Sequence, residues 1–281
     1  FGPLLEKPWL MLFGAAAQFG IFITLVLAGL FFDLPDAASI AVIGAADGPT
    51  AIFVANSLGS KYLGAIMVAA YSYMALVPIV QPPVIKLCTT KKERLIRMPY
   101  QKGSVSKTTK ILFPIVVTVL AGLVAPASVA LVGFLMFGNL LRECGVLNAL
   151  SETAQNVLAN LITIVLGLTV AGQMTADKFV QPDTLLILAL GLLAFVFDTA
   201  GGVLFAKLLN LFLPEGKKVN PMIGAAGISA FPMSGRVVNQ MGLAEDNQNF
   251  LLMYSISVNV SGQIASVIAG GLILTLMSGI A

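Results

Sequence analysis

The sequence predicts an all-α integral membrane protein, a polytopic helical bundle with inverted repeats and two broken or re-entrant helical segments. Apolar residues make up 58% of the chain and charged residues only 10%, whereas about a quarter of a soluble domain is charged. Apolar stretches recur at lengths near the ~20 residues that a helix needs to cross a bilayer. Two stretches are interrupted by glycine, proline and polar residues. These observations exclude a water-soluble fold of this length.

The apolar segments follow one another with no long polar domain between them, which indicates a single transmembrane domain over residues 1–281. We expect a fragment of a longer protein, because the chain starts at Phe1 rather than Met and its first apolar helix follows without a signal-peptide pattern. On this interpretation residues 1–85 are the remainder of a first repeat and residues 111–281 form a second. The segments cover residues 9–31, 37–57, 62–85, 111–141, 157–176, 184–213, 220–234 and 249–280.

The polar stretch 86–110 is strongly basic and carries Glu93 as its only acid. By the positive-inside rule this loop faces the cytoplasm. A topology signal alone explains the charges, and docking of an acidic soluble partner is the alternative. The basic residues are Lys86, Lys91, Lys92, Arg94, Arg97, Lys102, Lys107 and Lys110.

The chain has no histidine, which removes the commonest general base and metal ligand. Its two cysteines, Cys88 and Cys144, lie far apart without a CxxC companion, so we expect free thiols and neither a zinc site nor a disulfide framework.

The two interrupted segments, 37–57 and 220–240, resemble each other. Residues 43–51 read Ile-Gly-Ala-Ala-Asp-Gly-Pro-Thr-Ala, and residues 223–230 repeat Ile-Gly-Ala-Ala before their own polar break. Paired interruptions of this kind indicate a transporter site, because unwound backbone is tolerated in a membrane only where it lines a cavity. The alternative is a small-residue packing motif that recurs by chance.

Asp47 stands in an otherwise uncharged stretch, where a carboxylate costs about 2.5–3.5 kcal/mol at the bilayer centre. Gly48 and Pro49 follow it and free nearby carbonyls from helical hydrogen bonds. A carboxylate, free carbonyls and the Thr50 hydroxyl form an all-oxygen set that suits a hard cation, and we favour sodium. Capping of the next half-helix by Asp47 is the simpler role, and both can hold.

Neutral oxygens accompany the second break. Asn220, Ser229, Asn259 and Ser261 are candidates to complete a coordination shell, although such residues often bond to local backbone. Arg236 is the basic residue of the second interrupted motif, and its guanidinium suits a carboxylated group; snorkelling to lipid headgroups is the alternative.

Three further polar residues remain ambiguous. Tyr71 and Tyr73 are two apart, so a helix would turn only one of them toward a cavity. Asp198 is a second intramembrane acid, for which a role at a helix break is favoured over ion binding. An intramembrane aspartyl protease is disfavoured, because neither aspartate follows the Gly-x-Gly pattern.

The motifs Gly44–Ala51, Ala69–Pro78, Gln81–Pro83 and Asn220–Gly224 closely resemble the beta subunit of sodium-translocating biotin-dependent decarboxylases. The resemblance implies a translocase-type enzyme subunit that decarboxylates carboxybiotin delivered by a partner and couples this to Na⁺ export with proton consumption. It assigns cation or proton handling to residues matching Asp47, Tyr73, Asn220, Gly224, Ser229 and Arg236.

The resemblance also implies additional N-terminal helices that this chain lacks, a multi-pass position in the inner membrane of a prokaryote, and partners. The partners are a biotin carrier or carboxyltransferase subunit, a small membrane subunit and further copies of this chain in a homotrimer, with no nucleic acid. Combining both arguments, we predict catalytic roles for Asp47, Tyr73 and Arg236, carboxybiotin contact by Arg236, and a sodium site formed by Asp47, Thr50, Asn220, Gly224, Ser229 and Asn259. The alternative is a sodium-coupled secondary carboxylate transporter, which composition and broken helices suit equally well.

Overall fold

The computed structural model describes the chain except residues 101–102, 104, 174, 176–179 and 279–281. Lys102 of the predicted basic loop therefore lies outside the described residues. Regular structure in the described part is entirely helical, and six of its helical stretches are long and apolar enough to cross a membrane. These spans are Pro8–Ala28, Leu63–Cys88, Lys107–Val124, Asn148–Gly172, Pro182–Phe212 and Leu252–Met277. The predicted all-α polytopic membrane fold is confirmed.

The helices are often short or broken, and 3₁₀ turns join several of them; η4 is a π-helical turn. In chain order they are α1 (Gly2–Glu6), η1 (Pro8–Leu10), α2 (Met11–Ala16), α3 (Phe19–Ala28), α4 (Leu34–Ala41), η2 (Val42–Ala45), α5 (Gly48–Ser57), α6 (Leu63–Cys88), α7 (Lys91–Arg94), α8 (Lys107–Val124), η3 (Pro126–Ser128), α9 (Val129–Glu143), α10 (Asn148–Glu152), η4 (Thr153–Leu158), α11 (Ala159–Gln173), α13 (Pro182–Phe212), η5 (Pro221–Gly227), α14 (Met233–Glu245) and α15 (Leu252–Ser278).

Two apolar segments are divided more than the sequence predicts. The stretch 111–141 forms two helices, α8 and α9, because Pro126 forces Ala125 out of the helical region to φ −140° and ψ 78°. The stretch 9–31 is interrupted at Ala17 and Gln18, between α2 and α3. This third break carries no proline, although Gly14-Ala15-Ala16 before it repeats the Gly-Ala-Ala of the other two breaks.

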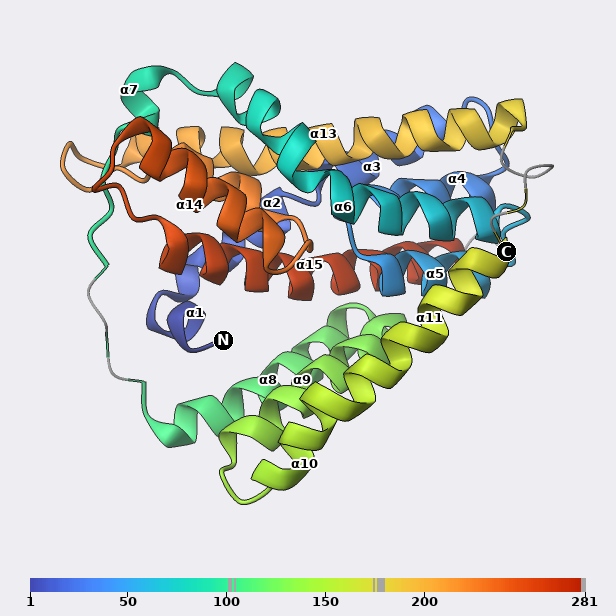
Figure 1. Ribbon diagram of the computed structural model, residues 1–281, viewed down its shortest axis with the longest axis horizontal. Coiled ribbons are helices and arrows are strands. Elements are labelled where there is room, and N and C mark those ends of the chain that lie inside the picture. Colours follow the sequence, from blue (N-terminus) through green and yellow to red (C-terminus); the bar gives the residue numbers. More distant parts are fainter. Residues whose placement is uncertain (101–102, 104, 174, 176–179, 279–281) are drawn as a thin grey trace.

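Helix α13 is the central element of the main bundle. It packs against α3, α6, η2 and η5, so it contacts the predicted breaks in both interrupted segments. Figure 1 shows the α8–α9 hairpin and α11 to one side of this bundle. Helix α11 exposes Leu161, Ile164 and Leu168, as a lipid-facing helix requires. The division into repeats of residues 1–85 and 111–281 stays a prediction.

Glycines allow the breaks to approach the long helices closely. A Cβ added to Gly202 of α13 would lie 2.1 Å from the Gly224 carbonyl oxygen of η5. A Cβ on Gly262 of α15 would lie 2.2 Å from the Gly227 oxygen. Both glycines therefore serve the same purpose as small residues at other membrane helix contacts, which is to bring backbones together.

The Gly202 contact predicts a large asymmetry between two alanine substitutions. Gly202→Ala should destabilise the protein by roughly 1–3 kcal/mol or more, because the methyl group meets backbone that cannot rotate away. Gly167→Ala on α11 has open space around it and should leave stability unchanged or slightly increased. Thermal unfolding of the detergent-solubilised variants measures both, and equal melting temperatures would contradict the packing described here.

Candidate functional site

The two interrupted segments meet inside the bundle. At the first break Ala46 adopts a left-handed conformation with φ 52° and ψ 41°, and Asp47 is extended before α5 begins. At the second break the chain leaves η5 in an extended conformation at Ile228. The Ser229 N–H then donates to the Ala45 carbonyl over 2.9 Å. Each break therefore supplies a hydrogen-bond partner for a backbone group of the other.

The half-buried Asp47 carboxylate gathers groups from three segments. Its Oδ1 accepts from the Thr50 N–H at 3.2 Å, so Asp47 caps α5. Its Oδ2 accepts from the Ser229 hydroxyl at 3.2 Å and from the Ser266 hydroxyl at 2.7 Å. The predicted capping role is thus real, and it coexists with contacts to the second break and to α15.

Helix α15 crosses both breaks with residues spaced three or four apart on one face. The Asn259 amide donates to the Ile228 carbonyl at 2.7 Å, and Gly262 lies against Gly227. One turn further, Ser266 reaches Asp47, and Gly270 lies where a Cβ would come 2.7 Å from the Thr50 methyl group. The helix therefore fixes the distance between the two breaks.

Two buried oxygens at the meeting point of the breaks have no hydrogen-bond partner among the described residues. They are Thr50 Oγ1 and Asn259 Oδ1. A cavity of about 280 Å³ is lined in part by Asp47, Thr50, Ser229 and Gln263, and Asn259 bonds to Ile228, the residue before Ser229. One carboxylate with neutral oxygens and no nitrogen ligand suits a hard cation of low charge.

The structure brings Asp47, Thr50, Ser229 and Asn259 to the meeting point of the breaks, as the sequence analysis expects. Ser261 faces elsewhere and donates to the Leu10 carbonyl of η1 and the Val258 carbonyl. Ser266 was missed, although it lies two helical turns beyond Asn259 and shares its face. That seven-residue spacing is the signal that would have found it.

The two tyrosines separate as their spacing predicts. Tyr71 covers the first break, since a Cβ on Gly48 would come 2.6 Å from its Cζ atom. Tyr73 lies on the side facing α13, where its ring contacts Gly191 and its hydroxyl donates to the Leu188 carbonyl. In this conformation Tyr73 does not touch the Asp47 carboxylate.

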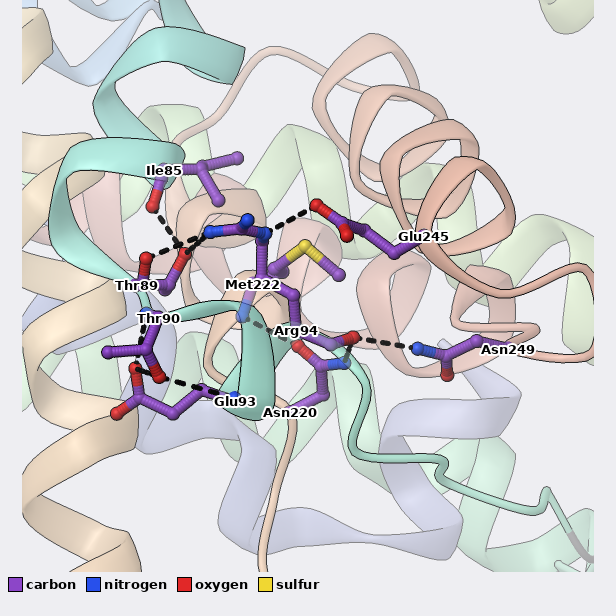
Figure 2. Close-up of polar contacts among 9 residues, drawn as sticks. All are labelled: Ile85, Thr89, Thr90, Glu93, Arg94, Asn220, Met222, Glu245 and Asn249. Atoms are coloured by element: carbon purple, nitrogen blue, oxygen red, sulfur yellow. Dashed lines mark hydrogen bonds and ion pairs between the residues drawn. The ribbon is translucent and has the colours of Figure 1, made fainter.

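Asn220 lies at the start of η5, where it joins the second break to the basic segment. Its amide donates to the carbonyls of Arg94 at 2.8 Å and Ile96 at 2.9 Å, and its oxygen accepts from the Met222 N–H at 3.1 Å. Figure 2 shows the contacts of Asn220 with Arg94 and Met222, and the pairing of Arg94 with Glu245 over 2.6 Å. All of these Asn220 contacts are to backbone, so the residue acts here as a clamp.

Gly224 and Arg236 also lie apart from Asp47's immediate partners. Gly224 packs backbone to backbone against Gly202 of α13. Arg236 is exposed on the first turn of α14, and its guanidinium forms no hydrogen bond or ion pair with another described residue. Its guanidinium is available to a ligand from outside the chain.

A basic cavity of about 370 Å³ lies near the clamp. Lys7, Arg97, Lys217 and Lys218 line it together with Glu6 and Tyr254. The Lys7 ammonium lies 4.3 Å from the centre of the Tyr254 ring and bonds to its hydroxyl. Burial and a hydrogen bond to Glu6 raise the pKa of nearby Tyr100 to about 12, so this phenol stays neutral at physiological pH.

Comparison with known proteins gives a consistent result. Residues 1–277 match the sequence model of the family described as Na⁺-transporting oxaloacetate decarboxylase beta subunit. The chain is 55% identical to the oxaloacetate decarboxylase beta chain of Klebsiella pneumoniae, over 98% of this chain and 64% of that protein. It is 51% identical to the methylmalonyl-CoA decarboxylase subunit beta of Propionigenium modestum, over 98% of this chain and 70% of that protein.

A third relative extends the range of named substrates. The chain is 47% identical to the glutaconyl-CoA decarboxylase subunit beta of Acidaminococcus fermentans, over 99% of this chain and 74% of that protein. The chain thus spans between about two thirds and three quarters of the length of these relatives.

The clamp predicts that Asn220→Ala destabilises the protein by about 1–3 kcal/mol, because buried backbone groups lose their partners. Asn56→Ala, at an exposed position on α5, should change stability by less than about 0.5 kcal/mol. Thermal unfolding with and without sodium separates a clamp from an ion ligand. The Asn220 variant should retain the sodium-dependent rise in melting temperature, and loss of that rise would make Asn220 a ligand.

Proposed function

This chain belongs to the family of Na⁺-transporting oxaloacetate decarboxylase beta subunits, and on that premise we propose that it is the membrane subunit of a sodium-pumping decarboxylase. In this role it decarboxylates carboxybiotin delivered by a partner subunit and uses the released free energy to export sodium. The observation that carries the proposal is the Asp47 carboxylate at the meeting point of two broken helices, beside buried oxygens without partners.

Sodium is the transported substrate in this proposal. The Asp47 carboxylate, Thr50 Oγ1 and Asn259 Oδ1 are the oxygens best suited to hold it, and the Ser229 and Ser266 hydroxyls orient the carboxylate. Gly224 and Asn220 take part in the site by positioning the backbone of the second break. A carboxylate and neutral oxygens balance one positive charge, which favours Na⁺ over a divalent ion.

Arg236 is the residue that we propose to contact carboxybiotin. Its exposed guanidinium has no partner among the described residues, and its planar set of donors fits a carboxylate. Carboxybiotin, when bound, supplies a carboxyl group whose loss as CO₂ consumes a proton. Arg236 would orient that group at the start of α14, the helix that leads directly from the second break.

Asp47 links the two processes by exchanging ligands. When sodium leaves, the carboxylate loses its counter-ion, and a proton can then neutralise it. When the next sodium ion binds, Asp47 releases that proton, and decarboxylation consumes it. Tyr73 would take part in this exchange only after its hydroxyl leaves the Leu188 carbonyl, because the observed contact commits it to α13.

The proposed complex includes a biotin carrier or carboxyltransferase subunit, a small membrane subunit and three copies of this chain, in the inner membrane of a prokaryote. Exposed Lys86, Lys91 and Lys92 and the basic cavity at Lys7 offer an acidic carrier a complementary surface. Arg94 and Arg97 are not available to it, since Glu245 and Asp246 already pair with them.

The proposal predicts sodium uptake that depends on carboxybiotin. Full-length protein in proteoliposomes, supplied with its carboxybiotinylated partner, should accumulate radioactive sodium, and Asp47→Asn should abolish the uptake because the substitution removes the only charge on the ion's ligands. Asp33→Asn, at an exposed position before α4, is the matched control and should leave uptake unchanged. Sodium flux that ignores carboxybiotin would instead support the secondary carboxylate transporter.

A further inference from the structure

The motif Gln81-Pro82-Pro83 of α6 plays no part in the function proposed so far. Gln81 lies inside the membrane span Leu63–Cys88, and its exposed fraction is 0%. A side-chain amide carries two N–H donors and an oxygen acceptor, and inside a membrane each of these needs a partner from the protein. The partners of Gln81 therefore show which parts of the bundle this residue joins.

Gln81 bonds to the second break and to α14 at the same time. Its Nε2 donates to the Ala225 carbonyl of η5 at 2.8 Å and to the Ser234 hydroxyl of α14 at 2.9 Å. The Ser234 hydroxyl has two acceptors within reach, which are Gln81 Oε1 at 3.0 Å and the Ala225 carbonyl at 3.1 Å. Ser234 is also fully buried. These three groups form a closed set of hydrogen bonds, the Gln81 network.

The Gln81 network fixes the start of α14 against η5. Ala225 lies within η5 and Ser234 in the first turn of α14, so bonding both to one side chain ties together the two ends of the loop between them. Arg236 follows Ser234 by two residues in the same turn. The backbone position of Arg236 therefore depends on the Gln81 network.

The proposed sodium site is held by other bonds. The Ser229 N–H donates to the Ala45 carbonyl, and the Asn259 amide donates to the Ile228 carbonyl. Neither bond involves the Gln81 network. The geometry of the sodium site and the position of Arg236 thus rest on different sets of hydrogen bonds, so a substitution can change one without the other.

We propose that Gln81 is a positioning residue for carboxybiotin, which acts through Ser234 to hold the Arg236 guanidinium where it meets the carboxyl group. A guanidinium binds a carboxylate through two parallel hydrogen bonds, which form only in a defined orientation. Loss of the Gln81 network releases that orientation and leaves the sodium site intact. This inference deepens the proposed function and rests on it for the identity of the ligand.

Steady-state decarboxylation by the full-length protein in detergent, with its carboxybiotinylated partner and saturating sodium, tests the inference. Gln81→Met keeps the length of the side chain but removes its donors. It should raise the KM for the carboxybiotinylated partner about tenfold, as loss of one hydrogen bond to a charged ligand does. Its dissociation constant for radioactive sodium, measured at equilibrium, should equal that of wild type.

Two further variants complete the comparison. Ser234→Ala should also raise the KM, and the double variant should be no worse than Gln81→Met alone, because both residues belong to one set of bonds. Gln155→Met is the matched control, since Gln155 likewise bonds to a backbone carbonyl and a serine hydroxyl, both from Ser151. It lies in η4, apart from both breaks, and should match wild type in both measurements.

An unchanged KM in Gln81→Met would overturn the inference and leave the proposed function intact. A KM and a sodium dissociation constant that rise by the same factor would also overturn it, because that result marks a general loosening of the second break. A wild type without sodium-dependent decarboxylation would overturn the proposed function itself. Should Gln81→Met fail to fold, Ser234→Ala decides, because it removes a single oxygen and must still raise the KM without changing sodium binding.

Discussion

The hydrogen bond from the Ser229 N–H to the Ala45 carbonyl joins two broken helices within a chain that must satisfy its backbone without water. In hydrocarbon each unpaired N–H or C=O costs several kcal/mol, so an interrupted helix survives there only if protein supplies the missing partners. Here each break supplies part of what the other lacks, and Asn259 of α15 bonds to the Ile228 carbonyl. The same unwinding that creates this demand also exposes oxygen atoms. Placing the breaks together therefore supplies the oxygens of the proposed cation site at little additional cost.

Close backbone contacts hold this arrangement in place. Gly202 with Gly224 and Gly262 with Gly227 bring α13 and α15 against the second break at distances that no side chain would permit. The hydrogen bond from Asn220 to the Arg94 carbonyl and the ion pair of Arg94 with Glu245 then fix the start of η5 against the basic segment. Few charged side chains lie inside the described bundle, and neither Asp47 nor Asp198 forms an ion pair with another described residue. Packing, rather than charge pairing, thus sets the geometry of the proposed sodium path.

Much of this architecture could be predicted from sequence because it depends on local chemistry. Length and hydropathy predict the spans, and Asp47-Gly48-Pro49 predicts both the break and its oxygens. The two-residue spacing also predicts that the side chains of Tyr71 and Tyr73 point in different directions on their helix. Which of them would face Asp47 could not be predicted, because that depends on where α13 crosses α6. Asn220 has a side chain equally able to bind an ion or backbone, and only its neighbours Arg94 and Ile96 decide. The break at Ala17 and Gln18 contains no proline, so the sequence does not predict it as clearly as the break at Asp47.

Anomalous diffraction from crystals of the full-length protein with thallium(I) in place of sodium tests most directly whether the paired breaks form the cation site. Our account predicts an anomalous peak at coordination distance from the Asp47 carboxylate and within reach of Thr50 Oγ1 and Asn259 Oδ1. Saturating thallium with no peak at Asp47, or ions bound only away from the two breaks, would contradict it.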